Sequence, residues 1–285
     1  MFKKEKFKII ILSLIVLACA FVWYAVYRED RHGVLTVSFL DVGQGDAIFI
    51  DAPNGNQVLI DAGPDKKVLR SLSEVMPFYD HEIDLIALSH PHTDHIAGFL
   101  DILPRYLVSG FIESGVSAKT PEYISLKKLT GENNIKEIEA LRGMKIDLGG
   151  GATMDVLLPG QNSSKDNPHE GMMVLRLVYG DTSFLLTGDL ENATEDMLVY
   201  LEGENIKSDV LKVGHHGSKN ATHPMLLGNV KPEYAVISVG VKNMYGHPAT
   251  ETLERIEKFE IPVLRTDEEG TITIKSDGEK IIVLP

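Results

Sequence analysis

The sequence predicts one large α/β domain behind an apolar amino-terminal segment. Residues 1–33 form the apolar segment and a short linker, and about 250 residues remain, which suits a single α/β domain. Apolar runs of strand length in this remainder end in polar turns, which is where open α/β sheets place their sites. Residues 34–285 contain no low-complexity linker and no repeat of fixed period, so we expect them to fold as one unit.

The amino-terminal segment has the length and polarity of a membrane span. Lysines between residues 3 and 8 precede an apolar run from Ile9 to Tyr27 that only Ser13 interrupts, and about 20 such residues cross a bilayer as a helix. A cleaved signal peptide is the alternative, because residues 18–20 are small, as cleavage sites require. The run continues past that point and ends in aromatic residues, which favours an uncleaved anchor. The lysines should stay in the cytoplasm, so we expect a single-pass membrane protein with an extracytoplasmic domain; secretion is the alternative.

The hexapeptide HPHTDH at 90–95 places three imidazoles and a carboxylate in one short loop. It follows a predicted apolar strand at 83–89, and apolar residues return at helical spacing over 96–100. Imidazole nitrogen suits zinc, iron and manganese, and a carboxylate neutralises part of the metal charge. A hydrogen-bonded turn or a helix cap explains any one of these residues, but the density of the cluster favours metal.

Three further motifs follow apolar runs at predicted strand ends: VLIDAG at 58–63, LLTGD at 185–189 and LKVGHHGS at 211–218. Together with HPHTDH, and in this order, they resemble the signature of the metallo-β-lactamase superfamily. The resemblance implies a four-layer αββα sandwich, with two mixed sheets face to face, helices outside and the site at one edge.

Further segments resemble the hydrolase domain of the ComEC competence family, the proteins of bacterial DNA uptake. They are FLDVGQGDA at 39–47, NMYGHP at 243–248 and the stretch 266–272, so the resemblance covers about residues 34 to 285. Full-length members embed this domain in a polytopic membrane channel and carry an oligonucleotide-binding-fold domain. The sequence shows neither, so we expect a free-standing relative, with a competence channel as a candidate partner.

The resemblance implies a hydrolytic centre with two divalent metal ions, zinc or manganese. The side chains assigned to metal are His90, His92, Asp94, His95, His169, Asp189 and His215. Asp189 corresponds to the carboxylate that bridges the two ions, and Asp61 to one that supports the metal loop from behind. His169 stands near the third motif of the superfamily, where many members have a histidine; a loop histidine in solvent is the alternative reading.

Catalytic roles fall to Asp94, His216 and His247. Asp94 is expected to orient the attacking water as well as to bind metal. Neighbouring residues of an extended chain point in opposite directions, so only one of this pair is expected to face a metal. His215 is assigned to metal, and His216 is expected to donate a proton to the leaving oxygen. The alternative for His216 is a hydrogen-bonded structural histidine. His247 precedes a predicted helix that starts near Ala249, and such a helix end suits an anionic substrate; a helix-entry turn explains it as well.

Charge and composition limit the substrate and the cofactor. Residues 1–33 carry six Lys/Arg and three Asp/Glu, which leaves 22 basic and 38 acidic groups in the domain and argues against an extended grip on DNA. The single cysteine, Cys19, lies in the membrane segment, so neither an intrachain disulfide nor a cysteine metal ligand is expected. Glycines at 41–46 and 148–152 are interpreted as turns, and no organic cofactor is predicted.

These observations predict a membrane-anchored, metal-dependent hydrolase of the metallo-β-lactamase type. The preferred substrate is a phosphodiester, either small or part of a short or single-stranded nucleic acid. One alternative is hydrolysis of a carbon ester, thioester, lactone or β-lactam, because the same activated water serves all of them. Another alternative is a catalytically silent metal-binding component of a competence or envelope complex.

Overall fold

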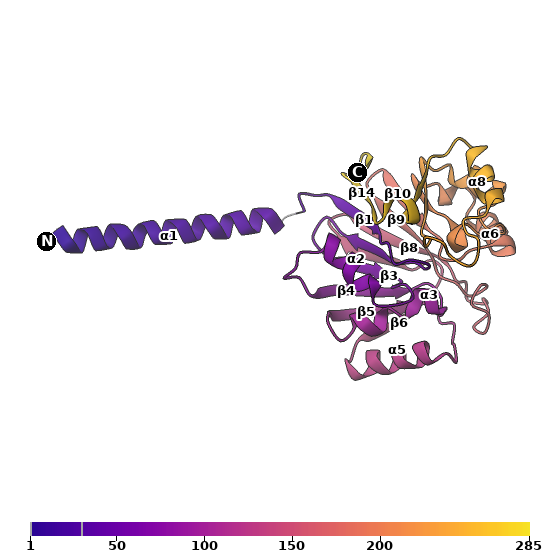
Figure 1. Ribbon diagram of the computed structural model, residues 1–285, viewed down its shortest axis with the longest axis horizontal. Coiled ribbons are helices and arrows are strands. Elements are labelled where there is room, and N and C mark those ends of the chain that lie inside the picture. The colour runs from indigo at the N-terminus through magenta and orange to yellow at the C-terminus, as the bar shows by residue number, and fades with distance from the viewer. Residues whose placement is uncertain (1, 30) are drawn as a thin grey trace.

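The computed structural model describes residues 2–29 and 31–285, and Figure 1 shows its elements. The first half of the chain forms α1 (Phe2–Glu29), β1 (Leu35–Phe39), β2 (Ile48–Asp51), β3 (Gln57–Ile60), α2 (Lys67–Val75), β4 (Glu82–Leu88), α3 (Thr93–Ile96), α4 (Phe99–Ile102), β5 (Leu107–Glu113), α5 (Pro121–Glu132) and β6 (Lys136–Glu139). The second half forms β7 (Lys145–Gly149), β8 (Ala152–Leu158), β9 (Val174–Tyr179), β10 (Thr182–Leu186), α6 (Asn192–Glu202), η1 (Gly203–Ile206), β11 (Val210–Lys212), η2 (Gly214–Gly217), α7 (Pro224–Val230), β12 (Tyr234–Ile237), α8 (Thr250–Glu257), β13 (Val263–Arg265), α9 (Thr266–Glu269), β14 (Ile272–Ser276) and β15 (Ile281–Val283).

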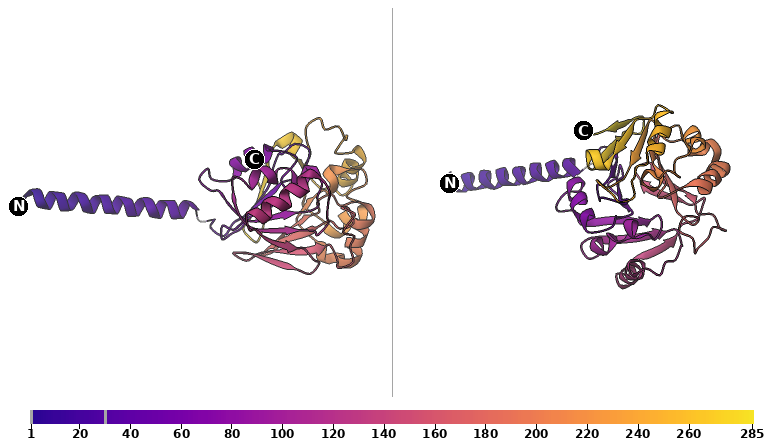
Figure 2. Two further views of the ribbon diagram at one scale, coloured as in Figure 1. Left: turned by 90° about the horizontal axis from the view of Figure 1, so that it is seen from below. Right: turned by 45° about the vertical axis from the view of Figure 1, so that its right-hand side comes forward.

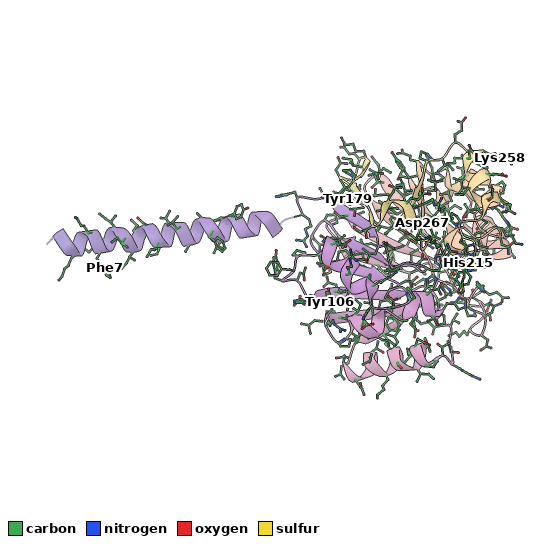
Figure 3. All side chains as sticks on the ribbon, in the orientation of Figure 1. Phe7, Tyr106, Tyr179, His215, Lys258 and Asp267 are labelled. Carbon is green, nitrogen blue, oxygen red and sulfur yellow. The ribbon has the colours of Figure 1, made fainter. Side chains whose placement is uncertain are left out.

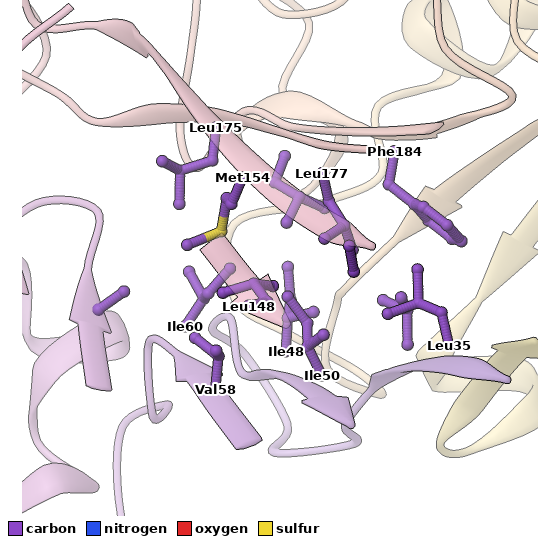
Figure 4. Packing of buried hydrophobic residues seen from close by; sticks show 14 of the residues in the cluster. Leu35, Ile48, Ile50, Val58, Ile60, Leu148, Met154, Leu175, Leu177 and Phe184 are labelled. Atoms are coloured by element: carbon purple, nitrogen blue, oxygen red, sulfur yellow. The ribbon is translucent and has the colours of Figure 1, made fainter. Parts of the chain in front are cut away.

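Two mixed sheets pack face to face. The first has the order β15-β14-β1-β2-β3-β4-β5-β6 and the second β13-β12-β11-β10-β9-β8-β7. Strands β3 to β6 run parallel, as do β10 to β13, while the remaining pairs are antiparallel. The alternating inward residues of both sheets, such as Ile48 and Ile50 opposite Leu175 and Leu177, form the shared core (Figure 4).

Helices cover the outer face of each sheet. Apolar residues of α2, α4 and α5 pack on the first sheet, as Leu72 and Leu126 illustrate. Those of α6, α7 and α8 pack on the second sheet, where Leu198, Leu227 and Ile256 are buried. Figures 1 and 2 show the resulting arrangement, which confirms the predicted four-layer αββα sandwich.

Helix α1 projects from the sandwich (Figure 1). Its stretch Lys6–Tyr24 is long and apolar enough to cross a membrane and makes no buried contact with the domain. This length and composition fit a membrane anchor and equally a signal sequence.

Most predicted local elements occur where the patterns placed them. The apolar strand expected at 83–89 is β4, but the helical restart after it is divided into the short helices α3 and α4. The glycine segment at 41–46 connects the hairpin β1–β2, in which Leu40 N donates to Ala47 O at 2.9 Å. Strands β3, β4, β10 and β11 lead into the four polar motifs, so their carboxyl ends position the site.

Candidate metal centre

The loop after β4 is held by hydrogen bonds to the loop after β3. Asp61 accepts from Ser89 N at 2.8 Å and from Ser89 Oγ at 2.6 Å. Ala62 N donates to His95 O at 2.7 Å, and a Cβ on Gly98 would lie 1.9 Å from Ala62 O. Only glycine allows this approach, so the backbone itself fixes where the imidazoles of the loop stand.

Four residues form a compact group at one side of the centre: Asp94, His95, Asp189 and His216. His95 Nε2 lies 3.3 Å from Asp189 Oδ1, and His216 Nε2 lies 3.6 Å from the same oxygen. Asp94 Oδ2 completes the group at 3.3 Å from His216 Nε2 and 4.0 Å from His95 Nε2. His95, Asp189 and His216 are buried, whereas the Asp94 side chain is about one third exposed.

His90, His92 and Asp189 form a second, adjoining group. His90 Nε2 lies 2.9 Å from His92 Nδ1 and 3.6 Å from Asp189 Oδ2. The two oxygens of Asp189 therefore face different histidines: Oδ1 faces His95 and His216, and Oδ2 faces His90. These buried His/Asp clusters are consistent with a binuclear metal site.

The spacing of the ligand atoms fits bound metal. Among the residues that the structure describes, His95 Nε2 and Asp189 Oδ1 are buried without a hydrogen-bond partner, although only 3.3 Å separates them. Two atoms each about 2.1 Å from one tetrahedral ion lie about 3.4 Å apart. A metal ion between them would satisfy both atoms, and without metal a proton on His95 Nε2 takes its place; otherwise both would carry the energetic penalty of unpaired buried polar groups.

Three histidines present Nε2 to the centre because Nδ1 is engaged elsewhere. His95 Nδ1 donates to Asp61 Oδ2 at 2.8 Å, and His216 Nδ1 donates to Ser238 O at 2.9 Å. The Ser89 hydroxyl gives its hydrogen to Asp61, so His90 Nδ1 donates to Ser89 Oγ at 3.0 Å. Such bonds select the tautomer and the ring orientation that metal binding needs.

The pair His215–His216 is arranged differently from the expectation. Both residues have left-handed backbone, with φ of 43° and 53°, so the rule for an extended chain does not apply. His216 lies in the compact group with Asp94, whereas the sequence predicts that His215, and not His216, binds metal. His215 is partly exposed at the rim, where Nδ1 contacts Glu191 Oε1 at 2.8 Å and Nε2 lies 3.6 Å from Asp189 Oδ2.

His169 and His247 border the centre without entering either compact group. The His169 ring lies 5.2 Å from that of His92 and 5.9 Å from that of His215, between ring centroids. The His247 ring lies 5.7 Å from that of His215 and stacks on Tyr245 with an interplanar angle of 16°. Both histidines therefore lie beside the partly exposed His215, and we call this exposed side of the centre, with His92 and Asp94, its opening.

The two groups differ in charge. Burial opposes protonation of His95 and His216, but Asp189 outweighs it, together with Asp61 for His95 and Asp46 for His216. These carboxylates hold the pKa of His95 well above its usual range and raise the pKa of His216 to about 9. Burial holds the pKa of His90 well below its usual range. Without metal, the compact group thus carries protons and the group around His90 does not.

Sequence reasoning missed a buried ion pair behind the centre, Asp46–Lys212. Both side chains are at most 1% exposed, and Lys212 Nζ also donates to Gly188 O at 3.0 Å. Asp46 Oδ1 lies 3.4 Å from His216 Nδ1. The sequence did contain one signal for this pair, because Lys212 lies inside the apolar run 210–213, which predicts a buried strand. A lysine is almost never fully buried unless it is paired with an opposite charge.

Comparison with known proteins gives consistent results. A family model described as "Metallo-beta-lactamase superfamily" matches residues 40–241. ComE operon protein 3 of Bacillus subtilis (strain 168) is 33% identical over 255 residues, which cover 83% of this chain and 32% of that protein. Competence protein ComA of Neisseria gonorrhoeae is 32% identical over 190 residues, which cover 67% of this chain and 25% of that protein. The chain thus spans about a third or less of these relatives.

A solved structure shares the fold. CmlA, a diiron β-hydroxylase from Streptomyces venezuelae, superimposes with a TM-score of 0.56 at 14% sequence identity, covering 88% of this chain and 54% of that one. At this identity the likeness concerns the fold alone.

Proposed function

The chain belongs to the metallo-β-lactamase superfamily, and on that premise we propose that it is a membrane-anchored hydrolase that cleaves phosphodiesters with two divalent metal ions. The observation that carries this proposal is the position of Asp189. Its Oδ1 and Oδ2 face separate groups of histidines at 3.3–3.6 Å, as a carboxylate shared between two ions requires.

We assign the ligands from this geometry. His90, His92 and Asp189 would hold one ion, and Asp94, His95, Asp189 and His216 would hold the other. His169, whose ring centroid lies 5.2 Å from that of His92, is the candidate to complete the first site. When bound, the two ions lower the pKa of water and stabilise the negative charge that develops during an in-line displacement at phosphorus.

The residues of the chain supply orientation and proton transfer. Asp94 is partly exposed at the opening, so its carboxylate can accept a hydrogen bond from the attacking water. His215 lies at the same opening and is oriented by Glu191, with 2.8 Å between Nδ1 and Oε1. We therefore give His215 the role of proton donor to the leaving oxygen, and His216 the role of metal ligand.

The loop 240–248 favours a substrate that contains a nucleobase. Asn243 fixes its shape: Nδ2 donates to Gly240 O at 3.0 Å and to His247 O at 2.6 Å, and Oδ1 accepts from His247 N at 3.0 Å. This leaves Tyr245 64% exposed on top of His247, where its ring offers a stacking surface. Because the domain is strongly acidic, we propose short or single-stranded nucleic acid, or a small phosphodiester, as the substrate.

A substrate panel tests the reaction class. The full chain, loaded with manganese or zinc in detergent, should hydrolyse bis(p-nitrophenyl) phosphate and short single-stranded DNA, and Asp189→Asn should abolish both activities. Asp181→Asn, at an exposed position, is the matched control and should leave them unchanged. Turnover of a lactone, thioester or β-lactam with no phosphodiester cleavage would replace the proposal by the carbon-ester alternative. Metal binding without any turnover would favour the catalytically silent component.

We further propose that α1 is an uncleaved anchor and that residues 34–285 form the extracytoplasmic hydrolase domain. Protease added to intact cells should remove the domain and leave a small membrane-bound fragment. If the domain is protected until lysis, it lies in the cytoplasm; if it is found in the medium without protease, the segment is a cleaved signal.

A further inference from the structure

Three exposed apolar side chains gather at one corner of the domain, next to the anchor. Phe78 and Tyr79, in the loop between α2 and β4, are 88% and 56% exposed, and Leu107 at the start of β5 is 70% exposed. The two aromatic rings pack edge to face with centroids 5.4 Å apart. Leu107 N donates to His81 O at 2.8 Å, which joins the loop to β5. We call Phe78, Tyr79 and Leu107 the aromatic corner; it contributes little to the core.

The end of the anchor lies against this corner. Arg31, the second residue after α1, lines a shallow hollow together with Tyr79 and Leu107. Its guanidinium binds the Asp51 carboxylate, with Nε 2.9 Å from Oδ2, so this part of the linker is fixed to the end of β2. Two residues span about 7 Å at most. When α1 crosses a membrane, the aromatic corner is therefore held close to the bilayer surface.

The metal centre lies at the other end of the same strands. Strand β4 begins at Glu82 beside the corner and ends at Leu88, two residues before His90, and its seven residues extend about 20 Å. Figure 3 agrees: Tyr106, the neighbour of Leu107, lies on the side from which α1 leaves, and His215 lies on the far side. Contact of the corner with the bilayer would turn the opening of the centre away from the membrane.

We propose that the aromatic corner inserts into the interfacial zone of the bilayer and so orients the tethered domain. Tyrosine suits this zone because it combines an apolar ring with a polar tip. Three side chains are too few for a stable protein interface, which buries about 1,200–2,000 Å². They suffice for a membrane contact here, because the anchor already holds the domain at a high effective concentration. The inference rests on the proposal that α1 is an uncleaved anchor.

Tryptophan fluorescence of the full chain in lipid vesicles tests this contact. The single native tryptophan, Trp23, lies in α1 and is first replaced by phenylalanine. In that background Phe78→Trp reports on the corner, and Tyr200→Trp, at an 88% exposed position on α6, is the matched control. The Phe78→Trp emission should be shifted to the blue, quenched by brominated lipid and at least partly shielded from acrylamide, whereas the control should show none of these effects.

Equal acrylamide quenching of both variants, without quenching by brominated lipid, would overturn the proposal. A second variant, with Phe78, Tyr79 and Leu107 all replaced by serine, should increase the rate at which a protease cleaves the linker in vesicles. Phosphodiesterase activity is measured in the same samples. Failure of the membrane contact with activity intact refutes only the orientation, and lipid quenching without activity refutes only the proposed reaction.

Discussion

The two halves of the metal centre differ in how completely the folded protein has built them. The half formed by Asp94, His95, Asp189 and His216 is largely buried, and its ring orientations are set by hydrogen bonds to other parts of the chain. The other half contains the equally buried His90, whose ring is held by Ser89, but its partly exposed His92 faces His169, whose ring stands farther off. The comparison teaches that preorganisation follows the number of side chains already gathered: with four in place the first half should hold metal in the resting protein, whereas the second, with three, is completed when metal or substrate enters.

Replacement of the two adjacent histidines should have the largest and most divergent effects. His216→Ala removes a ligand of the buried half, so we expect loss of one metal ion and activity near background. His215→Ala should keep both ions and lower kcat by about 10²–10⁴-fold, as loss of a general acid does. Metal analysis and steady-state kinetics measure both outcomes. Metal loss in His215→Ala with full occupancy in His216→Ala would restore the assignment made from the sequence.

Removal of the positive charge of Lys212, which lies behind the buried half, should destabilise the fold. Lys212→Met leaves the buried Asp46 carboxylate with His216 as its nearest remaining cationic partner, so it costs up to about 3–5 kcal/mol of the free energy of unfolding. Urea denaturation of the detergent-solubilised protein measures the change. The double replacement Lys212→Met with Asp46→Leu should recover part of the loss, because neither charge then remains. Equal stability of Lys212→Met and the wild type would show that the pair has no structural role.

Asp61→Ala tests whether the hydrogen bonds of this carboxylate position histidines in both halves of the centre. Its carboxylate binds His95 Nδ1 directly and His90 Nδ1 through Ser89. We expect metal affinity or activity to fall by about 10–100-fold, since partners of ligands have effects of that size. Titration with a competing chelator measures the affinity of each ion. If the affinity for only one ion falls, Asp61 positions ligands in one half of the centre only.

Metal affinity should depend on pH in the buried half and much less in the half around His90 and His92. The pKa of His216 is raised to about 9 and that of His95 lies well above its usual range, so both hold protons at neutral pH that metal must displace. Affinity should therefore rise with pH, by about tenfold per unit for each proton released, and level off above about pH 9 for His216. His90 and His92 have lowered pKa values and should release none. Calorimetry in buffers of different ionisation enthalpy counts the protons, and equal release from both halves would contradict the comparison.

Tyr245 should affect substrate binding and leave the metals in place. Tyr245→Ala removes a stacking surface worth about 1–3 kcal/mol per base, so KM for single-stranded DNA should rise while metal content stays constant. Tyr245→Phe keeps the ring and should behave like the wild type. A small phosphodiester without a base is the control substrate, and an equal rise of its KM would argue against stacking.

Local patterns were sufficient for the α/β class and for the place of the centre, and the resemblance of the four motifs to the metallo-β-lactamase superfamily supplied the αββα sandwich. Apolar runs of strand length, each ending in His, Asp or Gly, led to the strands β3, β4, β10 and β11 and to the motifs that follow them. Such patterns are local, because side-chain alternation and turn chemistry depend on neighbouring residues. The length and polarity of α1 were likewise readable from composition alone.

What the sequence by itself determined was therefore one α/β domain with a cluster of His and Asp residues at one edge, and its motifs identified the αββα sandwich only through their resemblance to a known superfamily. The tertiary structure decided which of two adjacent histidines enters the compact group, because left-handed backbone at 215 and 216 lets both rings face Asp189, whereas an extended chain would point them in opposite directions. It also decided the pairing of Asp46 with Lys212, which lie far apart in the chain. Both outcomes depend on packing between the two sheets, and contacts between distant segments leave no periodic signal in a single sequence.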